Sequence, residues 1–361
     1  MRPIRATIDL AAMRHNLALA RARAPRSRVW AVIKANAYGH GIERAASAFG
    51  AADGLAMVEI EAAVRLRERG IDKPMLLLEG FFDASELPEI SRHGLVTAIH
   101  SMRQVAMLEQ AALSSPVAVY LKLNTGMNRL GFDQISFIEA LARLRACRNA
   151  GDLVLMTHFA DADGARGVGE QMARLEGLFS SAAGQAAAGL PRSLANSAAT
   201  LRHPQTHGDW VRPGIMLYGC SPFEDQSAEA IGLRPAMTLT SEIIGVQRLQ
   251  AGDRVGYGGT YTAAGPLRVG IVACGYADGY PRQAPNGTPV LVEGTRVPTA
   301  GRVSMDLLFV DLSTLPNAGI GSPVTLWGKG LTADEVARCA GTVSYELLCA
   351  LATRVPVRET R

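Results

Sequence analysis

The sequence predicts an α/β protein with an N-terminal (β/α)8 TIM-like barrel followed by a C-terminal, mainly-β domain. Up to about Gly219, short apolar or β-branched runs alternate with longer amphipathic stretches, as in βα units around a parallel sheet. Beyond it, Gly- and Thr-punctuated runs such as MTLTSEIIGVQRL and LRVGIVACGY indicate strands. A chain of 361 residues also exceeds the usual single core of roughly 250–300 residues. We therefore expect two domains, 1–231 and 232–361.

The elements of the barrel can be assigned in chain order. The first helix is expected to begin after Asp9, whose side chain can cap backbone N–H groups, and to end before Pro25. Eight strand candidates follow, with helical patterns in most of the gaps: 30–34, 54–58, 74–79, 95–100, 117–124, 152–159, 192–196 and 210–219. In the second domain Thr332 and Glu335 have capping-box spacing, which predicts a short helix there.

Composition and charge exclude several classes of function. The net charge is +4 and the arginines are spread along the chain, which argues against nucleic-acid binding. The five cysteines show no CxxC spacing, so we expect neither a disulfide framework nor a metal site. The segment MRPIRATIDLAAMRHN carries charges where a signal peptide needs an apolar core, and no apolar run is long enough to span a membrane. We expect a cytoplasmic protein.

The first strand of the barrel leads to a lysine. In WAVIKANAYGHG, Lys34 ends an apolar strand and precedes a Gly-containing turn. Functional residues of such barrels gather at the carboxyl ends of the strands. A strand-end lysine is more often a surface charge, but a desolvated lysine can form Schiff bases with carbonyl groups.

The fifth strand predicts a charged residue inside the barrel. Alternation in VAVYLKLNTGMNRLGF places Tyr120 and Lys122 on the inward face. An unpaired ammonium there is costly, so Lys122 needs an anionic partner or a modification. Arg129 follows in the loop, where a guanidinium could clamp a carboxylate, although a solvated loop arginine explains this segment equally well.

The last three barrel strands add further candidates. LMTHFADAD carries His158, which by itself is more often a core residue than a catalyst. LANSAAT ends a strand at Ser197, and WVRPGIMLYG contains Arg212. Barrels often bind phosphate with the loops after strands seven and eight, and a serine hydroxyl with free backbone N–H groups suits that task.

The second domain contributes aromatic and charged residues that are individually ambiguous. They are Tyr257 in RVGYGGTY, Tyr276 and Arg282 in CGYADGYPR, Met305 in GRVSMDLL and Tyr345 in TVSYELL. Each fits an ordinary hairpin or loop as well as a site.

Taken together and in this order, these motifs resemble the alanine racemases, a family with an N-terminal barrel and a C-terminal β domain. AVIKANAYGHG is similar to the family's signature around the lysine that holds pyridoxal 5'-phosphate (PLP). NTGMNRLGF, VRPGIMLYG, VGYGGTY and GRVSMD also lie where the family has its motifs. The likeness spans essentially the whole chain.

The resemblance implies PLP as the cofactor. Lys34 would hold it as a Schiff base. Arg212 is similar to the arginine that contacts the pyridine nitrogen, and His158 to the histidine that pairs with this arginine. The cofactor phosphate would be held by Tyr38, Ser197, Tyr345 and the backbone of Gly214 and Ile215.

The resemblance further implies a two-base interconversion of L- and D-alanine by a homodimer with shared active sites. Lys34 would act at one face of the α-carbon and Tyr257 of the partner subunit at the other. Arg129 and the backbone N–H of Met305 of the partner subunit would bind the substrate carboxylate.

The roles of three residues are assigned only by the resemblance. Tyr276 and Arg282 are similar to residues lining the substrate entrance. Lys122 matches a lysine that is carbamylated in many members, which would turn its charge negative and let it orient Arg129. The family also implies a bacterial source, with D-alanine either supplied to peptidoglycan or consumed.

Three other functions compete with this interpretation. A PLP-dependent decarboxylase typically has a carboxylate at the pyridine nitrogen, where this chain has Arg212. A non-enzymatic PLP-binding barrel lacks the second domain that carries Tyr257. A broad-specificity racemase fits the same motifs, but its secreted examples carry a signal peptide.

Overall fold

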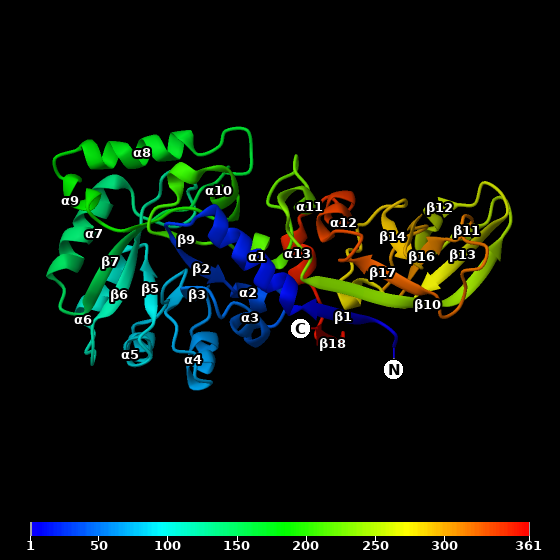
Figure 1. Cartoon of the computed structure of the whole chain (residues 1–361), viewed down its shortest axis with the longest axis horizontal. Coiled ribbons are helices and arrows are strands. Elements are labelled where there is room, and N and C mark those ends of the chain that lie inside the picture. Colours follow the sequence, from blue (N-terminus) through cyan, green and yellow to red (C-terminus); the bar gives the residue numbers. More distant parts are fainter. Residues whose placement is uncertain (1, 361) are drawn as a thin grey trace.

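The computed structural model describes residues 2–360. The predicted fold class is confirmed: a closed barrel of eight parallel strands lies at one end of the molecule and a β-rich part at the other (Figure 1). In order around the barrel the strands are β2 (Arg28–Val32), β3 (Gly54–Met57), β4 (Met75–Leu77), β5 (Val96–Ile99), β6 (Val117–Lys122), β7 (Ala150–Met156), β8 (Arg192–Ser193) and β9 (Trp210–Val211).

Helices alternate with the barrel strands along the chain, as the sequence predicts. They are α1 (Leu10–Arg23), α2 (Lys34–Tyr38), α3 (Ile42–Ala48), α4 (Ile60–Glu68), α5 (Leu87–Arg92), α6 (Met102–Gln110), α7 (Gln134–Ala146), α8 (Gly169–Ser180), α9 (Gln185–Ala188) and α10 (Ser197–Arg202). The predicted start of the first helix is confirmed, because Oδ1 of Asp9 accepts a hydrogen bond from the Ala12 N–H at 2.9 Å.

All eight barrel strands end earlier than the sequence suggested, and three of these ends decide where site residues lie. Strand β2 ends at Val32, and Lys34 is the first residue of α2. Ser197 begins α10 because the side chain of Asn196 caps the Ala199 N–H. The predicted strand 210–219 is a strand only at its first two residues, because Pro213 cannot donate a hydrogen bond to a neighbouring strand. The 3-10 helix η3 (Ile215–Tyr218) follows.

The interior of the barrel is filled by aromatic rings below its mouth. Trp30 of β2 stacks on Trp210 of β9 with ring centroids 4.4 Å apart. Its Nε1 donates to the hydroxyl of Tyr120 on β6 at 2.9 Å. The predicted inward face of β6 is therefore confirmed, and Lys122, two residues after Tyr120, lies on that same face towards the mouth.

The β-rich part contains one eight-stranded sheet and a two-stranded ribbon. The sheet runs β15-β14-β17-β10-β1-β18, with β13 on β10 and β16 on β13. Its elements and the ribbon are β1 (Arg5–Asp9), β10 (Met237–Leu249), β11 (Arg254–Val255), β12 (Tyr261–Thr262), β13 (Leu267–Val272), β14 (Pro289–Val292), β15 (Thr295–Pro298), β16 (Leu308–Asp311), β17 (Pro323–Trp327) and β18 (Val357–Thr360).

Strand β1 was not predicted, and it joins the two ends of the chain. It pairs antiparallel with β10 and parallel with β18, so residues 5–9 belong to the sheet of the C-terminal part. Only Ala6 and Ile8 of this strand are fully buried, and a pattern of two apolar positions is too short to recognise in the sequence.

Short helices lie between the sheet and the barrel: α11 (Ala228–Ile231), α12 (Ala333–Cys339) and α13 (Ser344–Cys349) (Figure 1). The predicted cap of α12 is confirmed, since Oγ1 of Thr332 accepts from the Glu335 N–H at 3.2 Å. Helix α13 was not predicted; it packs against α2 and brings the C-terminal part to the barrel mouth.

Within residues 2–360, no helix combines the length and apolarity that a bilayer crossing needs. The same residues contain no cluster of three or more His, Cys, Asp or Glu side chains arranged to hold a metal ion. All five cysteines are free thiols.

Replacing Gly39 by alanine is expected to lower the free energy of unfolding strongly. Gly39 has φ +77°, and a Cβ there would lie 2.1 Å from the Leu348 carbonyl oxygen of α13. The backbone strain costs roughly 1–2 kcal/mol and the overpacking roughly 1–3 kcal/mol more. Gly70→Ala is the matched control, because Gly70 has φ +83° and nothing within 4 Å of its Cβ position. Equal urea-unfolding energies for the two variants would contradict the contact with α13.

Candidate active site

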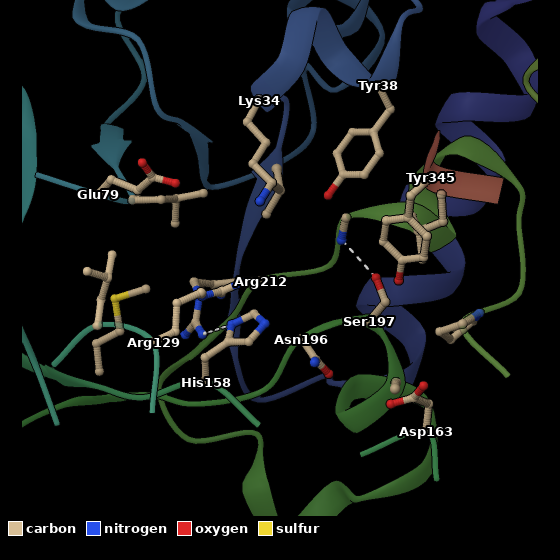
Figure 2. A pocket seen from close by; sticks show the side chains of 18 of the residues that line it. Lys34, Tyr38, Glu79, Arg129, His158, Asp163, Asn196, Ser197, Arg212 and Tyr345 are labelled. Carbon is tan, nitrogen blue, oxygen red and sulfur yellow. Dashed lines mark hydrogen bonds between the residues drawn. The ribbon is translucent and has the colours of Figure 1, made fainter. Parts of the chain in front are cut away.

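A cavity of about 530 Å³ opens at the mouth of the barrel (Figure 2). Its volume lies in the range of small-molecule sites, roughly 300–1,000 Å³. Ten of the candidate residues predicted from the sequence line it: Lys34, Tyr38, Lys122, Arg129, His158, Ser197, Arg212, Gly214, Ile215 and Tyr345. Nine of them come from barrel strand ends and their loops, and Tyr345 comes from α13. The structure therefore brings this group together in one place.

A left-handed turn aims Lys34 and Tyr38 into the cavity (Figure 2). The four residues from Ala35 to Tyr38 all have φ between 50° and 56°, a region that L-residues visit rarely and at a cost of roughly 1–2 kcal/mol each. Such a run persists only when its surroundings hold it.

His40 holds this turn from the inside. It is fully buried, and its Nδ1 lies 3.0 Å from the Ala37 carbonyl oxygen and 2.8 Å from that of Tyr38. Burial lowers the pKa of His40 to about 4, so the ring is neutral at pH 7 and its proton sits on Nδ1, which donates to these carbonyls. Sequence reasoning missed His40, although it lies within the lysine motif.

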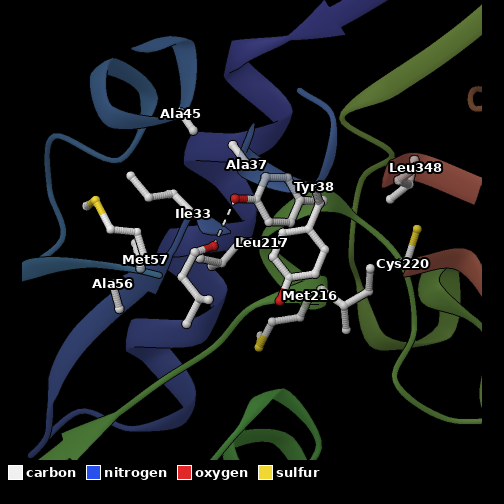
Figure 3. Close-up of a cluster of buried hydrophobic side chains, with 14 of the residues drawn as sticks. Ile33, Ala37, Tyr38, Ala45, Ala56, Met57, Met216, Leu217, Cys220 and Leu348 are labelled. Atoms are coloured by element: carbon white, nitrogen blue, oxygen red, sulfur yellow. Dashed lines mark hydrogen bonds between the residues drawn. The ribbon is translucent and has the colours of Figure 1, made fainter. Parts of the chain in front are cut away.

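Aromatic packing fixes the ring of Tyr38. The ring lies against that of Tyr218, with centroids 4.6 Å apart, and Tyr218 in turn contacts His40 at 4.6 Å. Tyr218 also donates its hydroxyl proton to the Val32 carbonyl at 2.9 Å. Tyr38 itself belongs to the buried apolar cluster that includes Ala37 and Leu217 (Figure 3). Gly214 leaves room for the Tyr38 hydroxyl, because a Cβ at position 214 would lie 2.4 Å from the hydroxyl oxygen.

Hydroxyl groups gather beside Gly214. Oγ of Ser197 accepts from the Gly214 N–H at 2.8 Å, which leaves the serine proton free to be donated elsewhere. The hydroxyls of Tyr38 and Tyr345 have no hydrogen-bond partner among residues 2–360, and the two rings are 6.0 Å apart. Three O–H donors thus face one side of the cavity.

Arg212 is a buried cation in the wall of the cavity. It is 3% exposed, and its guanidinium donates to the carbonyls of Ser193 at 2.5 Å and Thr157 at 2.6 Å. Burial lowers its pKa to about 10, which still leaves it charged at pH 7. Burial and the neighbouring Arg212 hold the pKa of His158 well below its usual value. His158 is therefore neutral, and its Nδ1 accepts from Arg212 at 3.5 Å.

Lys122 and Arg129 form a second cationic group in the wall. Lys122 ends β6, and the loop after it folds back so that the Phe132 N–H donates to the Lys122 carbonyl at 2.9 Å. This return brings Arg129 close to the lysine. Burial, followed by repulsion from Arg212 and Arg129, lowers the pKa of Lys122 to about 8. With this pKa, an appreciable fraction of the Lys122 side chain is a neutral amine near neutral pH.

Sequence reasoning missed three polar residues of this cavity: Glu79, Asp163 and Asn196. Glu79 counteracts the depression of the pKa of Lys122. It closes the predicted strand 74–79, so the strand-end rule that selected Lys34 could also have selected Glu79.

The other four candidates lie in a second hollow, on the C-terminal part. Tyr257, Tyr276, Arg282 and Met305 line a depression of about 880 Å³ that shares no residue with the barrel cavity. Tyr257 is 73% exposed and Met305 54%. A single chain therefore does not bring Tyr257 or Met305 to Lys34.

Two family models match this chain in succession. The model described as alanine racemase, N-terminal domain, matches residues 8–222, and the one described as alanine racemase, C-terminal domain, matches residues 236–359. The chain belongs to the alanine racemase family. The resemblance drawn from the motifs is confirmed, and members of this family use PLP.

Individual members of the family are similar to this chain over nearly their whole length. An alanine racemase of Erwinia tasmaniensis and a catabolic alanine racemase of Klebsiella aerogenes are each 56% identical, over 99% of both chains. The crystal structure of the biosynthetic alanine racemase of Pseudomonas aeruginosa superimposes with a TM-score of 0.95, at 48% identity and over 100% of both chains. The alanine racemase of Acinetobacter baumannii gives a TM-score of 0.93 at 37% identity, again over 100% of both chains.

Proposed function

We propose that the chain is a PLP-dependent alanine racemase that interconverts L- and D-alanine as a homodimer. The observation that carries the proposal is the barrel cavity, where a lysine, a buried arginine and three hydroxyls with protons available for donation face one space. Residues 1–231 would provide most of the cofactor site, with Tyr345 added from the C-terminal part, and residues 232–361 would also contribute to the active site of the partner subunit.

The residues of the cavity fit PLP. The hydroxyls of Ser197, Tyr38 and Tyr345 supply O–H donors of the kind that a phosphate accepts. Gly214 has no room for a side chain, which keeps its backbone accessible. Because the Gly214 N–H donates to Ser197, a phosphate oxygen would share this donor, and the neighbouring N–H of Ile215 would add another. Lys34 lies in the same cavity to bind the aldehyde carbon.

When bound, PLP would supply a conjugated system that delocalises the negative charge left on the α-carbon by proton removal. Lys34 would hold the cofactor covalently and then carry a proton on Nζ at one face of the substrate. Tyr257 of the partner subunit would do the same on the other face. Inversion needs a proton acceptor and a proton donor on opposite sides, and each such group contributes roughly 10²–10⁴-fold.

Arg212 and His158 would set the electronic character of the site. A guanidinium that stays charged at pH 7 would disfavour a second positive charge on the pyridine nitrogen of a cofactor held beside it. Neutral His158 accepts a hydrogen bond from Arg212 and keeps it in that orientation. This arrangement limits charge withdrawal into the ring and would suppress transamination.

The substrate carboxylate would be bound by Arg129 and by the Met305 N–H of the partner subunit. The Met305 N–H makes no hydrogen bond within residues 2–360 and is available for this contact. Tyr276 and Arg282 would line the way in.

Carbamylation of Lys122 is expected to make the activity respond to dissolved CO2. Only the neutral amine adds CO2, and with a pKa of about 8 the neutral fraction rises as the pH increases from 6.5 to 8.5. At fixed dissolved CO2, kcat/KM should increase over this range, with a carbamate signal in ¹³C NMR. Lys122→Ala should lose the response and raise KM for alanine by about tenfold, the value of one charge-assisted hydrogen bond.

Lys329→Ala is the control for this prediction, because Lys329 is exposed and lies outside both cavities. A wild-type enzyme with no carbamate signal at pH 8.5 would contradict the role given to Lys122.

The decisive experiment is to follow the interconversion of L- and D-alanine by the purified protein with PLP, beside a panel of other amino acids. Activity in both directions with a preference for alanine supports the proposal. A protein that binds PLP but exchanges no α-proton would instead be a cofactor-binding protein.

A further inference from the structure

Both ends of the chain converge on one buried carboxylate. Asp278 is completely buried in the C-terminal part. Its Oδ1 accepts from Nη1 of Arg2 at 2.7 Å and from Nε of Arg354 at 2.8 Å, and its Oδ2 accepts from Nη2 of Arg2 at 2.9 Å. The Gly275 N–H donates to the same Oδ2 at 3.0 Å.

The four donors keep this buried group ionised. Burial alone would raise the pKa of Asp278, but the hydrogen bonds from Arg2 and Arg354 outweigh it and hold the pKa below its usual value. Charge-assisted hydrogen bonds of this kind are roughly twice as strong as neutral ones. Asp278 is therefore a firm attachment point between distant segments, with Arg2 276 residues away in the sequence.

The attachment point is continuous with the second hollow. Asp278 ends the 3-10 turn η5 (Tyr276–Asp278), which lies directly against the loop of Met305. The Tyr276 N–H donates to the Ser304 carbonyl at 3.1 Å, and the Ala277 N–H donates to the Met305 carbonyl at 2.9 Å. The approach is so close that a Cβ on Gly275 would lie 2.4 Å from the Met305 carbonyl oxygen.

The two arginines also reach the Met305 loop directly. Nη2 of Arg354 donates to Oδ1 of Asp306 at 2.6 Å, and Nη2 of Arg2 donates to the Asp306 carbonyl at 2.8 Å. The loop is thus held on both sides of Met305 while the Met305 N–H stays free.

We propose that Arg2 and Arg354 are positioning residues that fasten the two ends of the chain to the loops carrying Tyr276 and Met305, and so hold the Met305 N–H where it binds substrate in the partner subunit. The inference rests on the proposed function. It assigns a task to the first and last segments of the chain, which lie outside the barrel cavity altogether.

The test compares Arg2→Gln, Arg354→Gln and the double variant with Arg296→Gln. Arg296 forms an equivalent two-pronged pair with Glu335 in the same part of the chain, but it lines neither cavity. The readouts are kcat and KM for both alanine enantiomers, the Kd for PLP from absorbance titration, the thermal midpoint of the apo protein, and the oligomeric state.

The double variant is expected to raise KM for both enantiomers by about tenfold or more, because a misplacement of about 1 Å can cost on the order of 10²-fold. The Kd for PLP should stay within about twofold of wild type, since neither arginine lines the cavity that would hold the cofactor. Arg2→Lys, which keeps one charged donor, should fall between wild type and Arg2→Gln. Arg296→Gln should leave KM unchanged.

Two outcomes would overturn the inference while leaving the proposed function intact. One is a double variant whose KM equals that of Arg296→Gln. The other is a loss that disappears at high protein concentration, which would mean that the arginines serve assembly rather than positioning. A wild-type protein that does not racemise alanine would instead refute the proposed function itself.

Discussion

Lys34→Ala is expected to abolish both alanine racemisation and covalent attachment of PLP. Lys34 is the lysine that the left-handed turn directs into the cavity beside the hydroxyls of Tyr38 and Ser197. In the proposed mechanism Nζ of Lys34 carries a proton, so its loss alone should lower kcat by roughly 10²–10⁴-fold, and the loss of the covalent link should lower it further. Borohydride reduction and mass spectrometry should find the cofactor on the Lys34 peptide of the wild type and on no peptide of the variant.

Two controls separate attachment from folding. Lys34→Arg keeps a long basic side chain but cannot make the link, since a guanidinium stays protonated at neutral pH. Lys122→Ala removes the other lysine of the cavity and should still carry the cofactor on Lys34. Small primary amines should partly restore activity to Lys34→Ala by occupying the space left by the side chain. An adduct on Lys122 in the Lys34→Ala protein would overturn this assignment.

The barrel was predictable because its signals are local. Each βα unit repeats a short apolar run and an amphipathic run, and Asp9 and Thr332 carry recognisable caps. Strand β1 and helix α13 were not predictable, since each has few apolar positions. Both are stabilised by partners more than 200 residues away in the sequence: β1 by β10, and α13 by α2. Such contacts leave no periodic pattern in the sequence.

The site residues also differ in whether a local sequence signal or a tertiary contact reveals them. The strand-end rule and strand alternation selected Lys34, Lys122 and His158 as candidates, each with a structural alternative, and the resemblance supplied their roles. His40 and Asp278 were missed because their importance lies in what they contact: the carbonyls of a strained turn in one case, the two ends of the chain in the other. Neither contact can be derived from spacing or composition.

Tyr257→Phe is expected to stop racemisation but not proton exchange. The phenylalanine keeps the ring and removes only the hydroxyl, so PLP should bind as in the wild type while kcat falls by roughly 10²–10⁴-fold. Lys34 would still remove the α-proton at its own face. One enantiomer of alanine should therefore exchange its α-proton with deuterium oxide without inverting, and the other should not exchange, as followed by ¹H NMR. The control is Tyr261→Phe, which removes a tyrosine hydroxyl from the neighbouring strand β12.

Mixing the two inactive proteins tests whether the active sites are shared. Within one chain Tyr257 lies in a different hollow from Lys34. In the proposed homodimer, each complete site would therefore need Lys34 from one subunit and Tyr257 from the other. A mixed dimer of Lys34→Ala and Tyr257→Phe subunits contains one site with both residues intact and one site with neither. Subunit exchange should consequently restore up to half of the wild-type activity per mixed dimer. Activity that stays at the level of the separate variants although mixed dimers form would mean that Tyr257 does not act on the substrate held by its partner. The second proton carrier would then have to be a residue of the barrel cavity, and Glu79 would be the first to replace.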